Sequence, residues 1–248
     1  MAARLAGLVL LSVVVMLGFV LQVRAARPTM ALDGFWSMCP NPLTRYCPSP
    51  STIASLTTTH DDDVIVLVAQ SKGGGNRVTS VADNDGHIWT LRAVINGPNP
   101  IWEYYTIANS PLSSDIVNVT WSHDVPPGSG YDAFIVFGVS GANTHSPWVP
   151  KFPVEITGWN GSSVALSVAG AGDFVIVSTA VNDAPPCFTT TNILPFQTIG
   201  EIGDGVYGEA DYFIKGTEGR TTVSFSCNPY SDPMTFLGDA LRGPGSQQ

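Results

Sequence analysis

The sequence predicts an all-β protein: an antiparallel double-sheet sandwich, jelly-roll-like, built from two sequence-related halves after an N-terminal signal or anchor helix. Three observations predict this fold. Beyond residue 25, short apolar or alternating runs are separated by Gly, Pro, Asn and Asp, which is typical of antiparallel strands and turns. Helical periodicity is weak in the same region, apart from one turn expected at residues 236–241. The strand patterns of the first half also recur, in the same order, in the second half.

Residues 1–25 have the features of a secretory signal. Arg4 supplies a positive charge, residues 5–23 form an uncharged run of 19 residues, and Ala25 is a small residue suited to cleavage. The same run could instead span a bilayer as an uncleaved anchor, because a spanning helix needs about 20 residues. Both alternatives place the remainder of the chain outside the cell or at its surface.

The chain is acidic. Its formal net charge is −9 at pH 7, and cleavage after Ala25 removes two arginines and changes this charge to −11. A negative field repels phosphate backbones and anionic membrane surfaces. The sequence therefore predicts no nucleic-acid partner and a membrane contact only through the N-terminal segment. The expected partner is an extracellular protein or a glycan, and self-assembly stays open.

Four cysteines form an even set in a chain directed to an oxidising compartment, which predicts two disulfides. Of the three pairings, we favour Cys39 with Cys47 and Cys187 with Cys227. The first two share a proline-rich segment, and the last two lie in the second half of the chain. Because proline disfavours both helices and central strands, the segment around the first pair is expected to be irregular.

The domain organisation follows from these boundaries. The expected segments are a signal or anchor at 1–25, an irregular Pro/Cys-rich segment at 26–55, a β-sandwich at 56–242 with halves at 56–140 and 163–242, and a disordered tail at 243–248. One shared sandwich buries more surface than two small domains would. Two separate small domains remain the alternative.

Individual strands are indicated by their patterns. Residues 64–69 are continuously apolar, so we expect a strand that is covered on both faces. Residues 78–82 and 88–94 flank an acidic bend and are expected to pair as a hairpin. The alternation in residues 116–121 predicts that its two valines and its tryptophan face inward, while Asn118 and Thr120 face outward.

The internal repeat is seen in three pairs of segments. The matched segments are DVIVLV at 63–68 with DFVIVS at 173–178, EYYTI at 103–107 with ADYFI at 210–214, and VNVTWS at 117–122 with TTVSFS at 221–226. The acidic bend of the first half has no clear second copy.

Four segments also carry a resemblance to other proteins. These segments are SLTTTHDDDVIVLVAQ, VTSVADNDGHIWTLRA, IWEYYTIANSPLSSDIVNVTWS and FGVSGANTHSPW. Together they resemble β-sandwich modules found in exported archaeal and bacterial proteins of unassigned function, over about residues 55–242. The resemblance lies in strand order and hairpin arrangement, so it implies the fold and export and carries over no functional residue.

The acidic bend is the candidate metal site. Asp83, Asn84 and Asp85, followed by Gly86, offer three oxygen-bearing side chains, and calcium binds several such oxygens at once. The spacing of an EF-hand and its terminal glutamate are missing. The same residues are those that a tight turn needs for positive φ, so a turn without a metal is the alternative. Calcium is the one candidate cofactor.

Aromatic residues are the candidates for ligand binding. Trp148 and Trp159 lie in a proline- and glycine-rich stretch, and Trp102 and Tyr104 lie in a predicted strand. Flat aromatic faces stack on sugar rings, which would suit a carbohydrate ligand. The alternative is that the strand aromatics fill the core, above all Trp102.

The sequence predicts no catalytic residue. Ser140 lies in GVSGA, which lacks the second glycine of a nucleophile elbow, and Glu103 is expected on the solvent face of its strand. Asn118 and Asn160 begin Asn-x-Ser/Thr triplets and are candidates for glycosylation.

The functional prediction is a non-enzymatic exported or cell-surface β-sandwich protein that acts in surface structure, adhesion or partner binding. A carbohydrate-binding module or lectin, with or without a calcium requirement, is the alternative. A secreted glycoside hydrolase is a further alternative, and it would need two carboxyl groups that face each other in a groove.

Overall fold

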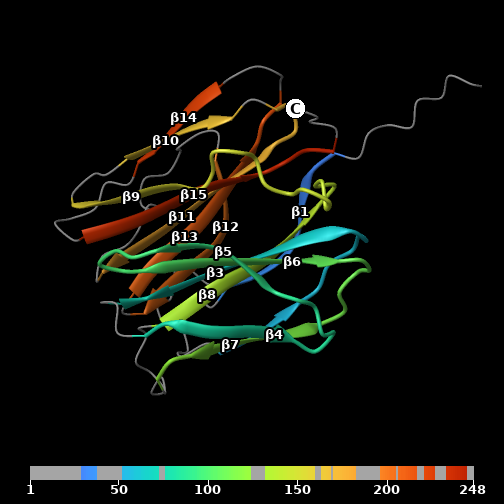
Figure 1. Cartoon of the computed structure of the whole chain (residues 1–248), viewed down its shortest axis with the longest axis horizontal. Coiled ribbons are helices and arrows are strands. Elements are labelled where there is room, and N and C mark those ends of the chain that lie inside the picture. The colour runs from blue at the N-terminus through green and yellow to red at the C-terminus, as the bar shows by residue number, and fades with distance from the viewer. Residues whose placement is uncertain are drawn as a thin grey trace, which may run out of the picture.

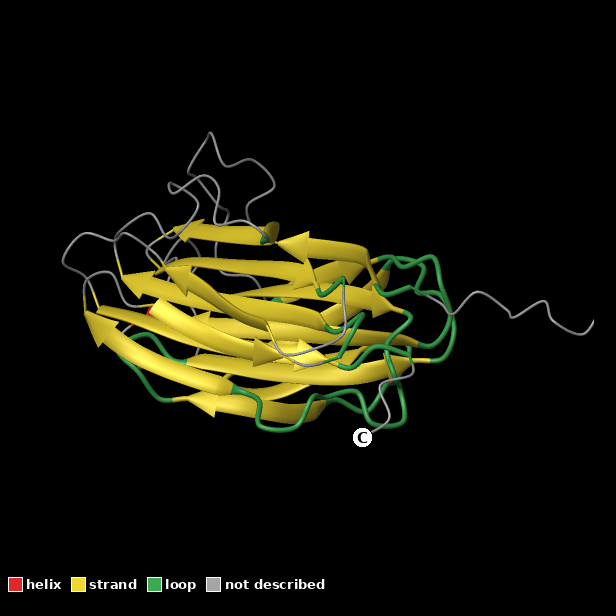
Figure 2. Cartoon of the chain, turned by 90° about the horizontal axis from the view of Figure 1, so that it is seen from above, coloured by secondary structure: helices red, strands yellow, loops and turns green. Residues whose placement is uncertain are grey.

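The computed structural model describes residues 29–37, 52–72, 76–123, 132–159, 163–168, 170–182, 196–204, 206–216, 221–226 and 233–244. In these ranges the chain is built from antiparallel strands in several sheets and contains no α-helix (Figures 1 and 2). The prediction of an all-β protein is therefore confirmed.

The strands form four sheets, which we call A to D. Sheet A has the order β1 (Ala31–Ser37), β8 (Asp132–Ser140), β3 (Asp63–Ser71), β6 (Ile101–Ala108) and β5 (Thr90–Ile95). Sheet B has the order β2 (Ile53–Leu56), β7 (Asp115–Trp121) and β4 (Val78–Asp83). Sheet C has the order β12 (Gln197–Asp204), β13 (Val206–Ile214), β11 (Phe174–Asn182), β15 (Pro233–Leu241) and β9 (Val154–Trp159). Sheet D consists of β10 (Ser163–Val168) and β14 (Thr221–Ser226).

The four sheets stack in the order B, A, C, D, as Figure 1 shows from bottom to top. Sheets A and C face each other across one apolar cluster, in which Val66 and Phe137 of sheet A pack with Ile176 and Leu237 of sheet C. The observed stack has four layers where the sequence predicts two. The additional layers arise because both large sheets are apolar on their outer faces as well.

The small sheets cover the outer faces of the large sheets over their central strands. Leu67 and Phe134 of sheet A pack against Val119 of sheet B, and Val177 of sheet C packs in one cluster with Leu166 of sheet D. Since a sheet covered on both faces has no solvent side, its strands need no polar alternation.

Strands β3 and β7 agree with their sequence patterns. Every residue of β3 is buried, as expected for a central strand between β6 and β8. In β7, Val117, Val119 and Trp121 are buried, Thr120 is exposed and Asn118 is half-buried, so the inward set is confirmed.

The predicted hairpin at 78–94 is wrong. Strand β4 pairs with β7 in sheet B, whereas β5 pairs with β6 in sheet A. The acidic bend therefore carries the chain from one sheet to the other. Its local conformation does match the prediction, because Gly86 has a φ of 77°. Turn-forming residues specify the local bend and leave the partners of the flanking strands unspecified.

Two further expectations are corrected. Residues 31–37 form β1, the edge strand of sheet A, although the segment 26–55 is predicted to be irregular. Residues 236–241 belong to β15 and form no helical turn. Their neighbouring apolar side chains resemble a helical pattern because both faces of sheet C are covered. The tail is also placed as far as Gly243, whose amide donates to Asp173 Oδ1 at 3.3 Å.

Several predicted features lie outside the described residues. They are the signal or anchor at 1–25, the four cysteines Cys39, Cys47, Cys187 and Cys227, the sequon residue Asn160, and the end of the tail at 245–248. Within the ranges that are described, no helix is long and apolar enough to cross a bilayer.

Candidate metal centre

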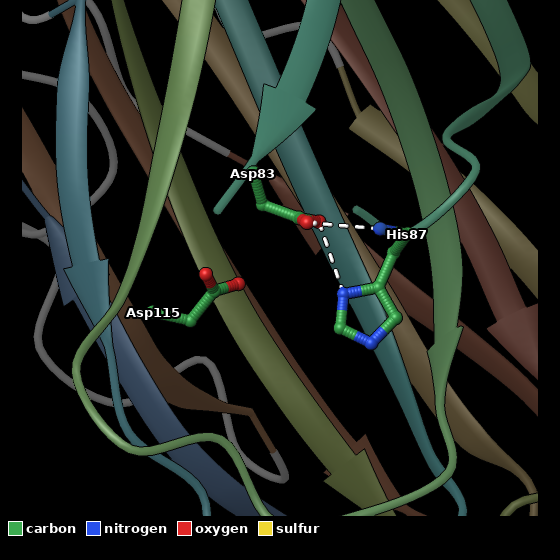
Figure 3. A group of neighbouring side chains, drawn as sticks. All are labelled: Asp83, His87 and Asp115. Atoms are coloured by element: carbon green, nitrogen blue, oxygen red, sulfur yellow. Dashed lines mark hydrogen bonds and ion pairs between the residues drawn. The ribbon is translucent and has the colours of Figure 1, made fainter. Parts of the chain in front are cut away.

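Asp83, His87 and Asp115 each bring one potential ligand atom to a point where all three atoms lie within 4.8 Å of one another (Figure 3). Asp83 is the last residue of β4 and Asp115 is the first residue of β7. Because these strands pair antiparallel, the end of β4 lies beside the start of β7. His87 follows in the bend that leaves sheet B.

Hydrogen bonds hold Asp83 in place. The backbone N–H of His87 donates to Asp83 Oδ1 at 2.9 Å, and the indole Nε1–H of Trp89 donates to Asp83 Oδ2 at 2.7 Å. The ring Nδ1 of His87 lies 3.1 Å from the same Oδ2. The side chain of Asp83 is only 1% exposed and that of His87 is 17% exposed. The carboxylate and the imidazole are therefore pre-oriented toward each other.

Asp115 completes the cluster from the opposite strand. Its Oδ1 accepts a hydrogen bond of 3.2 Å from the backbone N–H of Asn84, and the residue is 4% exposed. Burial raises the pKa of Asp115, and the negative charges of Asp83 and Asp85 raise it further. The site thus combines two desolvated carboxylates with one imidazole, which is a donor set found in metal centres. Without a metal, the same contacts would stabilise the bend and hold it against the start of β7.

The three predicted calcium ligands do not lie together in the structure. Asp83 lies at the centre of the cluster, whereas the side chains of Asn84 and Asp85 are exposed, and Asn84 contributes its backbone amide. Sequence reasoning missed His87 and Asp115. The i, i+4 spacing of Asp83 and His87 could have indicated the first, but only the pairing of β4 with β7 brings in Asp115.

The predicted ligand-binding aromatics do not form one site. Trp102 is 5% exposed and packs edge to face on Trp121, with ring centroids 6.1 Å apart. Tyr104 lies half-buried on the same face of β6, toward sheet B. Alternate residues of β6 face sheet C, so Trp148 is reached from the other side of the strand, through Tyr105.

Trp148 is held by two neighbours. Its ring meets that of Tyr105 edge to face at 5.3 Å, and the Arg92 guanidinium lies 4.7 Å from its centroid. Trp159 ends β9, and its side chain lies outside the described part of the chain. Asn118 is half-buried in the middle strand of sheet B, where its Nδ2 donates to the carbonyl of Ile116 at 3.4 Å.

A second polar cluster joins sheets A and C. Arg92 Nε donates to Asp239 Oδ2 at 2.8 Å, and Arg92 Nη2 donates to Asp239 Oδ1 at 3.3 Å and to the carbonyl of Phe152 at 2.7 Å. Glu103 is 0% exposed beside this pair, which corrects its predicted position on a solvent face. Burial raises the pKa of Glu103, and the negative charge of Asp239 adds to the effect. Both effects favour the protonated form of Glu103 beside the ion pair.

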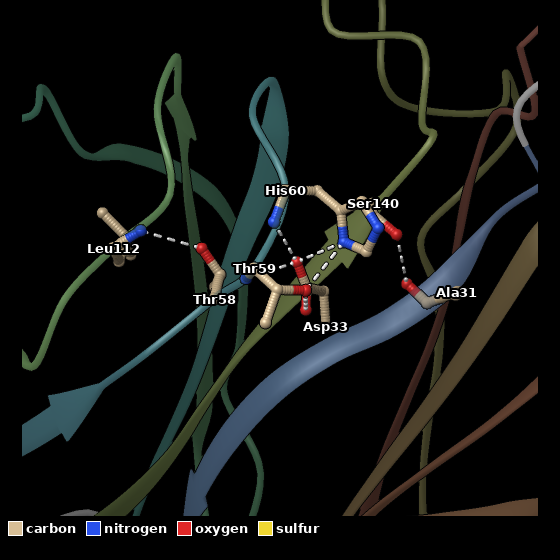
Figure 4. A network of polar contacts seen from close by, with 7 residues as sticks. All are labelled: Ala31, Asp33, Thr58, Thr59, His60, Leu112 and Ser140. Atoms are coloured by element: carbon tan, nitrogen blue, oxygen red, sulfur yellow. Dashed lines mark hydrogen bonds and ion pairs between the residues drawn. The ribbon is translucent and has the colours of Figure 1, made fainter.

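A third network holds β1 to the segment before β3 (Figure 4). Asp33 accepts hydrogen bonds from the backbone N–H groups of Thr59 and His60 at 2.9 and 2.8 Å and from the Thr59 hydroxyl at 2.7 Å. His60 Nδ1 lies 2.8 Å from the same carboxylate. Burial alone would raise the pKa of Asp33, but these bonds outweigh it and hold the pKa well below its usual range.

The same region contains the serine of GVSGA. Ser140 Oγ donates to the backbone carbonyl of Ala31 at 3.5 Å, so its hydroxyl contributes to the contact between β8 and β1 (Figure 4). Asp63 opens β3 close by and is fully buried, and burial, with the neighbouring Asp33, raises its pKa to about 7. This network serves the packing of an edge strand.

Comparison of the chain with protein-family models, with curated proteins and with solved structures gave no match.

Proposed function

We propose that this chain is a non-enzymatic, exported or cell-surface β-sandwich protein that binds another protein through a patch formed by Ile88, Leu91 and Tyr104, called here the corner patch. The single observation that carries the proposal is the exposure of its two aliphatic side chains: Ile88 is 86% exposed and Leu91 is 48% exposed. Exposed apolar side chains that gather in one place mark interaction surfaces.

The three residues lie over one face of β6. Leu91 pairs with Tyr104 across the ladder between β5 and β6. The carbonyl of Ile88 accepts a hydrogen bond of 3.1 Å from the hydroxyl of Thr106. Tyr104 and Thr106 are two residues apart in the strand and therefore face the same side. Leu91 thus lies beside the half-buried ring of Tyr104, and the exposed Ile88 is held next to Thr106 on the same face through its backbone carbonyl.

The partner that fits this surface is a protein segment with an apolar anchor and flanking lysine or arginine residues. The chain has a net charge of −9, and Asp85 is exposed in the bend next to Ile88. Complementary charge raises the association rate and suppresses wrong partners, while a buried apolar anchor supplies most of the affinity.

The positions of the carboxyl groups favour binding over hydrolysis. Glu103 and Asp239 are both 0% exposed, and Glu209 and Asp211 are both 4% exposed. Burial, followed by the neighbouring Asp211, raises the pKa of Glu209 to about 10. Carboxyl pairs enclosed inside the sheets differ from the two solvent-accessible carboxyls that flank a sugar in a glycosidase. Trp102 also gives little support to a lectin role, because its indole is buried and cannot stack on a sugar ring.

The test is a peptide selection on the immobilised full chain. A library of random displayed peptides should yield sequences that combine an apolar anchor with basic residues. Binding of these peptides should weaken at least about 10-fold in Ile88→Lys and in Leu91→Lys, because either change places a cation at the anchor position. Phe35→Lys is the matched control, since Phe35 is 54% exposed at the opposite edge of sheet A.

Three results would count against the proposal. Selected peptides could bind all variants equally, the library could yield no binder, or a glycan array could give binding that depends on Tyr104, which would support the lectin alternative. Concentration-dependent association of the unmodified chain that Leu91→Lys abolishes would assign the patch to a second copy of this chain instead.

The proposal includes export and a duplicated sandwich. Export is supported by the signal pattern of residues 1–25, and terminal sequencing of the mature chain tests it. Duplication is supported by equivalent pairing in the two large sheets: β3 pairs with β6 and β8, and β11 pairs with β13 and β15. Two of the three matched segment pairs lie in these sheets, in β3 with β11 and in β6 with β13, and the third lies in β7 and β14 of the small sheets.

A further inference from the structure

We infer that Asp83, His87 and Asp115 bind one divalent transition-metal ion, of the class of Co²⁺, Zn²⁺ or Mn²⁺, in preference to Ca²⁺. This inference stands apart from the proposed function, because it depends on the cluster beneath the bend and not on the corner patch.

The donor set selects the metal class. Calcium takes six to eight oxygen ligands, and the cluster offers two carboxylates and one imidazole nitrogen. Imidazole suits zinc, copper, iron and nickel ions, while carboxylates also accept manganese. Two carboxylates, a neutral imidazole and a divalent ion together carry no net charge, so the ion would neutralise two acidic groups that are removed from water.

The geometry is close to that of a coordination sphere. Ligand atoms bound to one tetrahedral ion lie about 3–3.5 Å apart. Asp83 Oδ2 and His87 Nδ1 already have this separation, at 3.1 Å, and all three ligand atoms lie within 4.8 Å. Asp115 therefore needs to approach by less than about 2 Å to complete this geometry.

The position of the Asp115 side chain indicates that a cation binds in this cluster. Its carboxylate is 4% exposed and points toward Asp83 and His87 in Figure 3. A buried carboxylate directed at a second carboxylate is unfavourable unless a cation compensates it.

The surrounding donors orient the ligands as they do in metal sites. Trp89 Nε1–H fixes Asp83, and the backbone N–H of Asn84 fixes Asp115. Such outer hydrogen bonds set ligand orientation, and their loss typically costs about 10- to 100-fold in metal affinity. Three protein ligands also leave at least one coordination position for water, and His87 is the member that reaches solvent, at 17% exposure.

The experiment is a Co²⁺ titration of the full chain, followed by visible absorption and calorimetry. We expect one Co²⁺ per chain, d–d bands of a low-coordinate site, and no sulfur-to-cobalt charge-transfer band. The absence of that band separates this site from binding by the four cysteines of the sequence. A tenfold excess of Ca²⁺ should leave the spectrum unchanged.

Variants assign the ligands. His87→Ala and Asp115→Asn should each weaken Co²⁺ binding at least about 10-fold, and Trp89→Phe should weaken it by a similar factor without removing a ligand. Asp115→Asn keeps an oxygen that can accept the Asn84 amide, so it tests the charge with little change in shape. His145→Ala is the control, since His145 lies in a separate exposed turn.

The inference is overturned if the unmodified chain binds none of the three ions at millimolar concentration. It is also overturned if both ligand variants bind Co²⁺ as the unmodified chain does, or if Ca²⁺ displaces Co²⁺ at equal concentration. The contact between His87 and Asp83 would then be a structural pin of the bend.

Discussion

Replacing Arg92 by Met removes the cation that pairs with Asp239 between sheets A and C while keeping most of its aliphatic stem. Arg92 donates three hydrogen bonds, two of them to Asp239 and one to the carbonyl of Phe152. Asp239 is 0% exposed and Glu103 beside it is also 0% exposed. The variant therefore leaves a carboxylate enclosed between two sheets with no compensating charge.

The expected cost is large. Breaking a buried ion pair by removing one partner typically destabilises a protein by about 3–5 kcal/mol. For a chain of this size, each kcal/mol lowers the melting temperature by about 2–4 °C, so the decrease should lie between about 6 and 20 °C. Part of the cost is avoided if Asp239 takes up a proton, and the loss should therefore be smaller at pH 5 than at pH 8.

Urea unfolding followed by tryptophan fluorescence measures the free energy of unfolding of both chains. Arg77→Met is the matched control, because Arg77 is exposed, and it should change stability by less than about 0.5 kcal/mol. If Arg92→Met unfolds within about 0.5 kcal/mol of the unmodified chain, the ion pair does not stabilise the contact between the sheets and the reasoning is refuted.

Two further predictions concern the contact of β1 with the segment before β3. Folding raises the pKa of Asp63 to about 7. The contribution of Asp63 to stability is therefore complete below about pH 4 and is lost as the pH rises to 7. Asp63→Asn cannot ionise, so this variant should show a flatter dependence of urea stability on pH over the same range. A pH dependence that is unchanged in the variant would contradict this assignment. Gly34 has a φ of 83°, and a Cβ there would overlap the carbonyl oxygen of Thr57, so Gly34→Ala should cost more than about 2 kcal/mol. Gly86→Ala, with a φ of 77° and open space around it, should cost only about 1 kcal/mol, and equal losses in the two variants would show that the close approach at Thr57 does not matter.

The sequence predicted those features of the fold that depend on local pattern. The apolar run of β3 identified a strand covered on both faces, and the alternation of β7 identified its inward valines and tryptophan. Both predictions succeed because burial imposes a period of two on a strand, or removes that period when both faces are covered.

The predictions that are wrong concern features that depend on which strands, distant in the sequence, pair with each other. Nothing in residues 78–94 indicates that β4 pairs with β7 while β5 pairs with β6. Glu103 was expected in solvent because a charged residue in a strand is usually exposed. Its burial is tolerated because a bulge between Leu91 and Ala93 directs Arg92 toward Asp239 of the other large sheet.

For the same reason, the sequence predicts only part of the candidate metal centre. The acidic bend supplied Asp83 and its turn chemistry, but Asp115 lies 32 positions further along the chain and arrives through strand pairing. Alternation divides the predicted aromatic site, since Trp102 and Tyr104 face sheet B while Trp148 contacts Tyr105 on the opposite face of the same strand.

The common interior of sheets A and C makes the covalent link between them dispensable for their association. A cut after the exposed Lys151 would sever the peptide between β8 and β9, yet Val66 and Phe137 would still be enclosed by side chains of the other fragment. The nicked molecule would be a heterodimer whose two subunits were once a single polypeptide, and neither fragment would have a complete interior on its own.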